Sequence, residues 1–256
     1  MTDKTSHVAV EEATIADLHA AYMSGRATVR GVMQAHLARI AAYDKKGPAL
    51  GLVIALNDRA LEEADALDAA VASSGKLVGP MHGIPVLAKD NYDVAGVQTT
   101  GGSRAMVGWV PAKDATVIAK LRAAGAIVIA KVTMSEWARG GVDNINSVLP
   151  GFARNPYNTA YATGGSSGGT GGSVAAGYGV VGLGSDTWGS IRNPSSNNAI
   201  CGLRPTWALV SRAGMIGLYS ARDMSGPMTR TMTDLARRAA ELDAADPLAE
   251  HVDRFV

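Results

Sequence analysis

ATVIAKLRAAGAIVIAKV, residues 115–132, decides the fold class of this chain. Its first part, residues 115–124, spaces apolar side chains as a helix does and stops at Gly125. Its second part, AIVIAKV (126–132), is a nearly continuous apolar run, which is typical of a strand buried on both faces. Upstream, GIPVLAK (83–89) follows a Gly-Pro turn and also reads as a strand. Strand, helix and strand in succession predict an α/β fold, with a mixed, largely parallel sheet flanked by helices on both faces.

The N-terminal part of the chain predicts a helical layer outside this sheet. Residues 14–25 and 28–43 space apolar side chains at three and four, and Thr28 is an expected N-cap. A third helix is expected over residues 59–72. The histidines of this layer are expected to be surface polar residues rather than ligands: His7, His19 and His36.

We expect a single α/β domain over residues 1–256, with the helical layer at 1–74 and the core at 75–245. Within the core, Ser135–Arg139 is expected to begin another helix. A last helix-like run covers residues 233–243.

Composition excludes several classes of protein. Of 256 residues, 47% are hydrophobic and 18% are charged, which is enough apolar material for a substantial core. The net charge of +1 removes the usual electrostatic argument for nucleic acid or an anionic membrane. Cys201 is the single cysteine, so an intramolecular disulfide framework is excluded.

Targeting signals are not evident in the sequence. The first residues lack the basic start and apolar centre of a signal peptide. The longest stretch without a charge or a histidine, Asn155–Ser185, is interrupted by Pro156 and by GGSSGGTGG, so it does not read as a membrane-spanning helix. We therefore expect a soluble cytoplasmic protein.

Glycine dominates one segment. Eleven of the 30 glycines fall between Gly164 and Gly189, among apolar residues, and the segment carries no charge before Asp186. Such a segment predicts close approach of backbone to backbone, or of backbone to a ligand. Tight packing alone is the alternative explanation.

Three short motifs match without their required context. GxGxxG at Gly177–Gly182 follows a helix-like stretch and enters a strand, the reverse of a dinucleotide-binding turn. GGSSGGTGG lacks the Gly-Lys-Ser/Thr that holds phosphates. Ser73–Lys76 matches S-x-x-K in a polar turn without companion motifs.

A serine nucleophile needs a base to accept its proton, and this sequence offers histidine or lysine for that role. Ser167 lies at the centre of a G-x-S-x-G pattern, but His251 is the single histidine that follows it, which leaves a Ser-His-acid esterase as a less favoured alternative. His82 favours a structural role. A lysine can serve as the base when burial lowers its pKa, by up to ~3–5 units. Lys89 ends an apolar strand, although spacing alone does not single it out.

Four segments resemble the amidase signature family: GPMHGIPVLAKDN (79–91), KVTMSEWARGG (131–141), ATGGSSGG (162–169) and GSDTWGSIRNP (184–194). The resemblance runs from about residue 10 to residue 245. Members of this family hydrolyse amide bonds, and often ester bonds, with a Ser–cis-Ser–Lys triad. The separation of the two serines here, 190 − 166 = 24, is the one usual in the family.

The resemblance assigns the catalytic roles. It implies that Ser190 is the nucleophile, that Ser166 on a cis peptide is the bridging serine, and that Lys89 is the terminal base. An acyl-enzyme intermediate follows from these roles, with no metal and no organic cofactor. Asp90 would oppose catalysis if it contacted the Lys89 ammonium, so we expect its side chain to point elsewhere.

The same resemblance places supporting groups around the nucleophile. The backbone N–H groups of Thr187, Trp188, Gly189 and Ser190 are the expected oxyanion hole. Ser167 is expected to support the hydrogen-bond network. Asp186 and Arg192 are expected to brace the loop as an ion pair or a hydrogen-bonded pair.

Two departures from the family matter. Trp188 stands where glycine is common. Because tryptophan takes a positive φ only at a cost, either this position has ordinary dihedrals or the oxyanion hole is reshaped. The indole is also expected to narrow the acyl pocket. The chain also stops where family members continue, which predicts an uncovered sheet edge or apolar surface and, from that, a homo-oligomer.

The sequence therefore predicts an amidase acting on small-molecule amides, with esters as a side activity. Nucleic acid and membrane are not expected as partners. Two alternatives stay open. One is a glutamine-hydrolysing amidotransferase subunit, and the other is a shortened, catalytically weak scaffold that acts as a binding or assembly protein.

Overall fold

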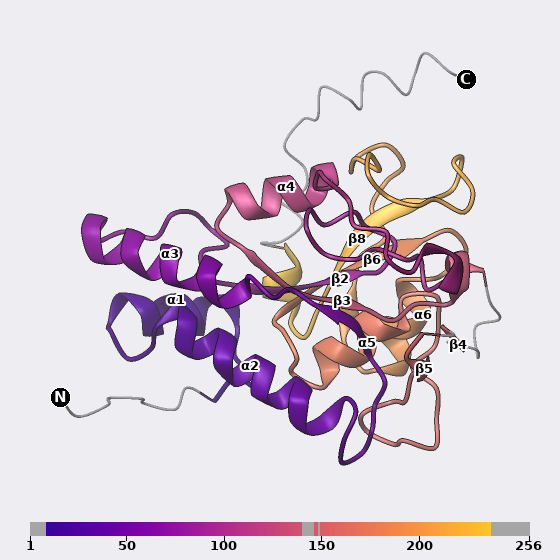
Figure 1. Cartoon of the computed structure of the whole chain (residues 1–256), viewed down its shortest axis with the longest axis horizontal. Coiled ribbons are helices and arrows are strands. Elements are labelled where there is room, and N and C mark those ends of the chain that lie inside the picture. The colour runs from indigo at the N-terminus through magenta and orange to yellow at the C-terminus, as the bar shows by residue number, and fades with distance from the viewer. Residues whose placement is uncertain (1–8, 140–145, 148, 237–256) are drawn as a thin grey trace.

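The computed structural model describes residues 9–139, 146–147 and 149–236 (Figure 1). Three helices form the N-terminal layer: α1 (Ile15–Met23), α2 (Val29–Tyr43) and α3 (Ala60–Ser74). The side chains of Thr14 and Thr28 cap the first two by accepting backbone N–H groups of the first turn. The three predicted helices, and Thr28 as a cap, are confirmed.

The centre of the structure is a six-stranded sheet in the order β1-β3-β2-β6-β8-β7. The three central strands, β3, β2 and β6, run parallel, and the outer pairs are antiparallel. The predicted mixed α/β sheet is confirmed. Its strands are β1 (Val53–Leu56), β2 (Pro85–Lys89), β3 (Ile127–Val132), β6 (Val181–Asp186), β7 (Cys201–Gly202) and β8 (Met224–Thr229).

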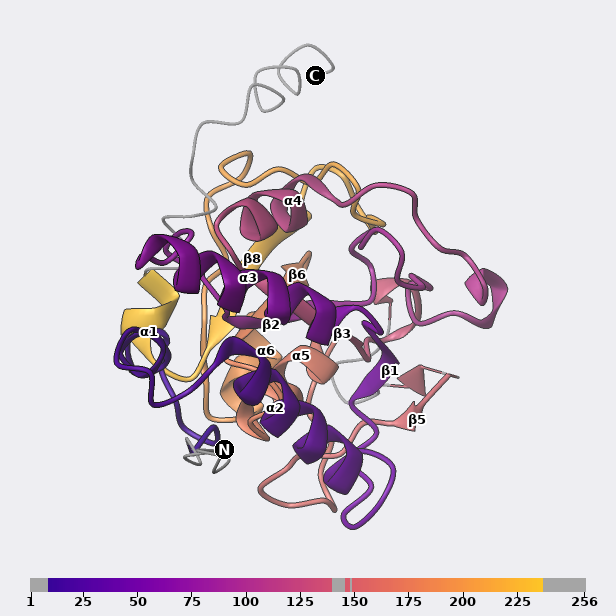
Figure 2. The ribbon, with the colours of Figure 1, turned by 60° about the vertical axis from the view of Figure 1, so that its left-hand side comes forward.

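Two crossovers place helices on both faces of this sheet. Helix α4 (Thr116–Ala123) joins β2 to β3, and α5 (Gly168–Ala175) lies between β3 and β6. Because β3 and β6 lie on opposite sides of β2, two right-handed crossovers put their helices on opposite faces. Figure 2 shows α4 above the strands and α5 below them. The remaining elements are short: the 3-10 turns Arg104–Met106 and Glu136–Ala138, β4 (Asn146–Ser147), β5 (Gly151–Phe152) and α6 (Arg192–Asn197).

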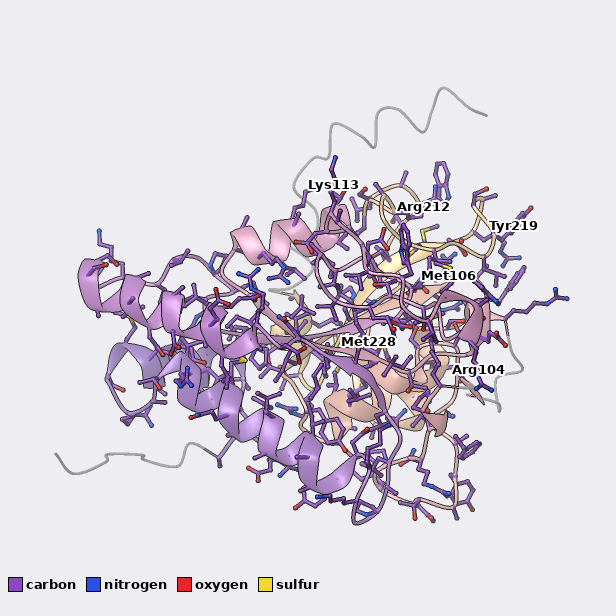
Figure 3. The ribbon with its side chains drawn as sticks, viewed as in Figure 1. Arg104, Met106, Lys113, Arg212, Tyr219 and Met228 are labelled. Atoms are coloured by element: carbon purple, nitrogen blue, oxygen red, sulfur yellow. The ribbon has the colours of Figure 1, made fainter. Side chains whose placement is uncertain are left out.

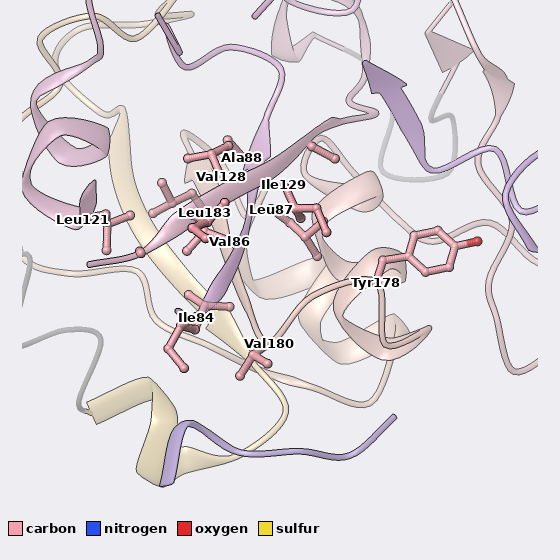
Figure 4. Packing of buried hydrophobic residues seen from close by; sticks show 14 of the residues in the cluster. Ile84, Val86, Leu87, Ala88, Leu121, Val128, Ile129, Tyr178, Val180 and Leu183 are labelled. Atoms are coloured by element: carbon pink, nitrogen blue, oxygen red, sulfur yellow. The ribbon is translucent and has the colours of Figure 1, made fainter. Parts of the chain in front are cut away.

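Every residue of β2, β3 and β6 is buried, which explains why those strands read as apolar runs. Their side chains interdigitate with those of the covering helices, as Leu121, Val128 and Leu183 do in Figure 4. A continuous apolar cluster reaches from Val10 to Val210. The domain boundaries drawn from the sequence stay a prediction.

Two local predictions are wrong. His36 is fully buried rather than on the surface, and its Nδ1 lies 2.9 Å from the carbonyl oxygen of Gly177, so one of its two ring nitrogens has a partner inside the core. Ser135–Arg139 contains only a 3-10 turn, in which Trp137 and Ala138 have φ of 53° and 56°. The predictions for His7 and for most of residues 233–243 lie outside the described residues.

The expected open edge is covered along part of β8. The N–H of Leu203 donates to Pro227 O at 3.1 Å, and a Cβ added to Gly226 would lie 2.2 Å from Leu203 O. The segment after β7 therefore lies directly against this strand. Apolar side chains are nevertheless exposed on the loop that holds Val107, Trp109 and Val110.

Contact between α5 and β3 depends on a residue without a side chain. A Cβ at Gly169 would lie 2.2 Å from Thr133 O and 2.4 Å from Thr133 N, which are backbone atoms that cannot turn away. We expect Gly169→Ala to lower the free energy of unfolding by at least ~1–3 kcal/mol in urea denaturation. Gly31→Ala is the control, because its Cβ would approach only Thr28 Oγ1, at 3.2 Å, inside helix α2. A Gly169→Ala chain as stable as the wild type would contradict this packing.

Candidate active site

The polar side chains that the sequence singled out lie where the central parallel strands end. Lys89 is the last residue of β2 and Asp186 is the last residue of β6. Ser166 and Ser167 come immediately before α5, which packs on the same strands. Since parallel strands present their carboxyl ends at one edge of the sheet, these groups meet there.

Lys89 is fully buried, and its contacts are all to uncharged oxygens. Its Nζ lies 2.7 Å from Ser166 Oγ, 2.8 Å from Ser185 Oγ and 3.3 Å from Ser185 O. Burial lowers the pKa of Lys89 to about 7, against the opposing charges of Asp186 and Asp223. A large fraction of this amine is therefore neutral near neutral pH.

Ser166 is held by backbone and side chains on both sides. The Gly165–Ser166 peptide bond is cis, and Ser166 O accepts the N–H of Ser135 at 3.1 Å. The N–H of Gly165 donates to Asn193 Oδ1 at 3.1 Å. Gly164 precedes this bond with φ +73°, and a Cβ there would lie 2.3 Å from the same Asn193 oxygen. The glycines of this segment thus allow the backbone to approach α6.

A backbone hydrogen bond places Ser190 beside Ser166 and Ser167. Its carbonyl accepts the N–H of Ser167 at 3.1 Å, and the residue is half-buried. Within the described part of the chain the hydroxyl of Ser190 makes no hydrogen bond. The structure therefore joins Lys89 to Ser166 directly and brings Ser190 to the neighbouring peptide, without a hydrogen bond between the two hydroxyls.

One of the four expected oxyanion donors is already occupied. The N–H of Gly189 donates to Asp186 Oδ1 at 2.7 Å, so its inclusion in the hole is wrong for this arrangement of the loop. For the N–H groups of Thr187, Trp188 and Ser190 no hydrogen bond is found among the residues described. Gly189 takes φ +118°, whereas Trp188 keeps a negative φ, so the tryptophan causes no backbone strain.

Asp186 ties the loop together from a fully buried position. Besides Gly189 it accepts the N–H of Ile191 at 3.1 Å, Arg192 Nε at 3.1 Å and Arg204 Nε at 3.2 Å. Burial by itself would raise the pKa of Asp186, but the hydrogen bonds from Arg192, Gly189 and Ile191 hold that pKa below its ordinary value. The sequence pointed to Asp186 and Arg192 and missed Arg204.

Ser167 is bonded in a way that suits support rather than attack. It is fully buried, its hydroxyl donates to Ser185 O at 3.1 Å, and it accepts the N–H of Ser185 at 3.2 Å. His251, the base required by the alternative esterase, lies outside the described residues. Nothing in the described part of the chain supports Ser167 as a nucleophile.

Sequence reasoning missed two residues that fix the lysine. Ser185 supplies two of the three oxygens around Lys89, and Asn91 Nδ2 donates to Ser185 Oγ at 3.2 Å and to Ile216 O at 3.0 Å. Both residues lie inside or next to the segments that carry the family resemblance. Their side-chain contacts depend on the sheet, so spacing alone could not have shown them.

The loop between β6 and α6, residues 187–191, borders a cavity of about 550 Å³. Segment 208–223 lines it, including Arg212 and Tyr219, which lie on loops at one end of the molecule in Figure 3. Trp188 is 59% exposed and stacks on Tyr219, with ring centroids 6.1 Å apart. Thr187 Oγ1 donates to Asp223, another lining residue. Two side chains of this loop, those of Trp188 and Thr187, therefore contact residues that line the cavity.

Residues 9–139, 146–147 and 149–236 contain no group of three or more His, Cys, Asp or Glu side chains suited to hold a metal ion. In the same ranges, no helix is both long enough and apolar enough to cross a membrane.

The family model called Amidase matches residues 31–255. Because this match covers most of the sequence, the chain belongs to the amidase family. The chain is 40% identical over 239 residues to a glutamyl-tRNA(Gln) amidotransferase subunit from Alkaliphilus metalliredigens (strain QYMF), a match that covers 93% of this chain and 48% of that protein.

Solved structures give the same result for the fold. Native peptide amidase from Stenotrophomonas maltophilia superposes with a TM-score of 0.89 at 39% identity, covering 96% of this chain and 50% of that one. The corresponding glutamyl-tRNA(Gln) amidotransferase subunit from Thermotoga maritima superposes with a TM-score of 0.79 at 30% identity, covering 94% and 49%. The chain thus spans about half the length of the relatives that it matches.

The hydrogen bonds accepted by Asp186 predict that this carboxylate stabilises the folded chain in a pH-dependent way. Because the pKa of the folded carboxyl is lowered, its contribution is present above the unfolded pKa of about 3.9 and is lost as the pH falls below that value. We expect Asp186→Asn to lower the free energy of unfolding by about 1–3 kcal/mol at neutral pH, with a difference that narrows between about pH 5 and about pH 3. Denaturant titrations of both chains at each pH measure this.

The control is Asp58→Asn, a change at an exposed carboxyl. A difference for Asp186→Asn that stayed constant into acid would show that the carboxylate charge does not hold the loop.

Proposed function

We propose that this chain hydrolyses carboxylic amides, with Ser190 as the nucleophile, Ser166 as the bridging hydroxyl and Lys89 as the base. One observation carries the proposal: a fully buried lysine amine lies 2.7 Å from Ser166 Oγ and has no carboxylate bonded to it. A lysine in that state can accept a proton, which an ordinary surface lysine cannot do at neutral pH.

The contacts of Lys89 fit its neutral form. A neutral amine has two N–H groups and one lone pair, and Ser185 offers two acceptors, its Oγ at 2.8 Å and its O at 3.3 Å. The lone pair is then left for the hydroxyl of Ser166. In this arrangement Ser166 donates its proton to Lys89 and receives the proton of Ser190 as that oxygen attacks the amide carbonyl.

The rest of the cycle follows from this proton transfer. The tetrahedral oxyanion accepts the N–H groups of Thr187, Trp188 and Ser190, each donor contributing ~3–4 kcal/mol in comparable sites. When the C–N bond breaks, the proton on Lys89 returns through Ser166 to the leaving amine. Water then attacks the acyl-Ser190 ester along the same route, which releases the carboxylic acid and restores the serine.

The relatives suggest two classes of substrate. One relative is called a peptide amidase, and another is called an amidotransferase subunit. For this chain we favour a small or peptidic amide as the substrate. Glutamine hydrolysis as part of a larger assembly is the second candidate, because the relative that suggests it is equally similar in sequence. Ester cleavage as a side activity, homo-oligomerisation and a cytoplasmic location stay predictions.

Lys89, Ser166 and Ser190 form the proposed proton relay, and removal of any one of their side chains is expected to abolish turnover. Ser190→Ala, Ser166→Ala and Lys89→Met should each lower kcat/KM by at least ~10²–10⁴-fold. Activity of the wild type should rise with pH through about 7, because Lys89 acts as a base only when deprotonated. Ammonia release from an amidated peptide and from glutamine, together with p-nitroanilide cleavage, measures activity and separates the two substrate classes.

Ser196→Ala is the matched control, since Ser196 is exposed and lies on the short helix that follows the loop. Loss of activity in His251→Ala, with activity kept in Lys89→Met, would replace this mechanism with the esterase alternative. A wild-type chain that releases ammonia from neither substrate would favour the scaffold alternative.

Trp188 is expected to set the size of the acyl group. Its indole stacks on Tyr219 beside the cavity, so removal of the ring opens space next to the nucleophile loop. We expect Trp188→Gly to shift the preference between short-chain and long-chain acyl p-nitroanilides by about tenfold toward the longer chain. Tyr157→Ala, an exposed aromatic on another loop, is the control. An unchanged substrate profile in Trp188→Gly would refute this role.

A further inference from the structure

A second buried lysine lies beside the relay and has no part in it. Lys131 is fully buried in β3, with its Nζ 3.0 Å from Asp90 Oδ1 and 2.6 Å from Thr99 Oγ1. Asp90 is also fully buried. Taking two charges out of water costs free energy that their attraction barely offsets, so a buried ion pair is weak evidence for a purely stabilising role.

The register of the strands fixes which way these groups point. Lys131 pairs with Ala88 in the parallel β2–β3 ladder, and the N–H of Asp90 continues that ladder by donating to Val132 O at 3.1 Å. Successive side chains of a strand point to opposite faces. Lys89 therefore points to one face, and Asp90 points to the other together with Lys131.

The remaining oxygen of Asp90 is engaged on that same side. Asp90 Oδ2 accepts the N–H of Thr100 at 3.0 Å, the hydroxyl of Thr100, and the N–H of Gly102 at 3.2 Å. The expectation that Asp90 points away from Lys89 is confirmed. Both of its oxygens are held by the loop after β2 and by Lys131.

The charges around the two lysines are arranged differently. Lys89 faces the carboxylates of Asp186 and Asp223 at a distance, and Asp186 is itself paired with Arg192 and Arg204. Lys131 faces Asp90 and Asp93, and the pair with Asp90 is direct. Asp90, although adjacent to Lys89 in sequence, is not among the groups that raise the pKa of Lys89.

We propose that Lys131 is a positioning residue of the active site: it holds and neutralises the Asp90 carboxylate, so that Lys89 remains free of a counter-ion and can act as a base. The inference rests on the proposed function for its purpose. Its physical content, a charge that cancels the charge of the Asp90 carboxylate next to Lys89 in sequence, can be measured without turnover.

Removal of the Lys131 charge should return the Asp90 charge to Lys89. A carboxylate on the adjacent residue that has lost its counter-ion favours the protonated lysine, and we expect it to raise the titration midpoint of Lys89 by about one unit. Lys131→Met removes both the charge and the hydrogen bond. Lys131→Gln removes the charge but keeps an N–H donor for Asp90. The double variant Asp90→Asn/Lys131→Met removes both charges at nearly constant volume.

The readout is the titration of Lys89 in the whole chain labelled with ¹³C-lysine, with its signal assigned from Lys89→Met. We expect the midpoint to rise by about one unit in Lys131→Met and Lys131→Gln and to return to the wild-type value in the double variant. The acid limb of kcat/KM should move in parallel. A merely structural role of Lys131 would change stability and leave the midpoint where it was.

A folded single variant with an unchanged Lys89 midpoint would overturn the proposal. If neither Lys131 variant folds, Asp90→Asn decides: it leaves the Lys131 charge without its partner, so the proposal expects a lower Lys89 midpoint, and an unchanged midpoint refutes it. If the wild type shows no Ser190-dependent turnover, the proposed function fails, and the titration still reports on the pair.

Discussion

Lys89 keeps its amine in a fully buried position, surrounded by serine oxygens, and the rest of the site depends on that placement. A lysine in water would be charged, and a lysine beside a carboxylate would stay charged even when buried. This fold avoids both conditions. β2 carries Lys89 into the interior. Asp90 is paired with Lys131 and Asp186 with two arginines, and Asp223 accepts hydrogen bonds from Thr187 and from two backbone N–H groups.

Glycine makes this placement possible by letting backbone segments touch. Gly169 brings α5 against Thr133, the residue that follows β3, and a Cβ at Gly182 would lie 2.4 Å from Thr170 Cγ2, so the same helix also lies directly on β6. The segment just before α5 is thereby held at the end of β2, where Ser166 meets Lys89. Larger residues at these positions would lift the helix from the sheet and lengthen the contact between lysine and serine.

Patterns local in the sequence predicted the fold, and contacts distant in the sequence were missed. The alternating strand and helix signals were enough to predict the sheet and its crossovers, because each signal is contained in one short segment of the sequence. The catalytic roles came from family resemblance, since nothing in its spacing separates Lys89 from a solvated lysine. Arg204 and Ser185 were missed because their partners lie on other elements. His36 was misplaced because the partner of its Nδ1, the carbonyl of Gly177, is distant in sequence. The Gly189 N–H was misassigned because its partner depends on how the loop turns.

In the proposed mechanism, a buried neutral lysine activates Ser190 through Ser166. Peptide mapping by mass spectrometry, after reaction of the whole chain with a fluorophosphonate, tests it most directly, because the reagent bonds covalently to an activated serine. The account predicts an adduct on Ser190 that forms faster as the pH rises through about 7 and that is absent from Lys89→Met. An adduct on Ser167, or labelling of Ser190 that is equally fast without Lys89, would contradict it.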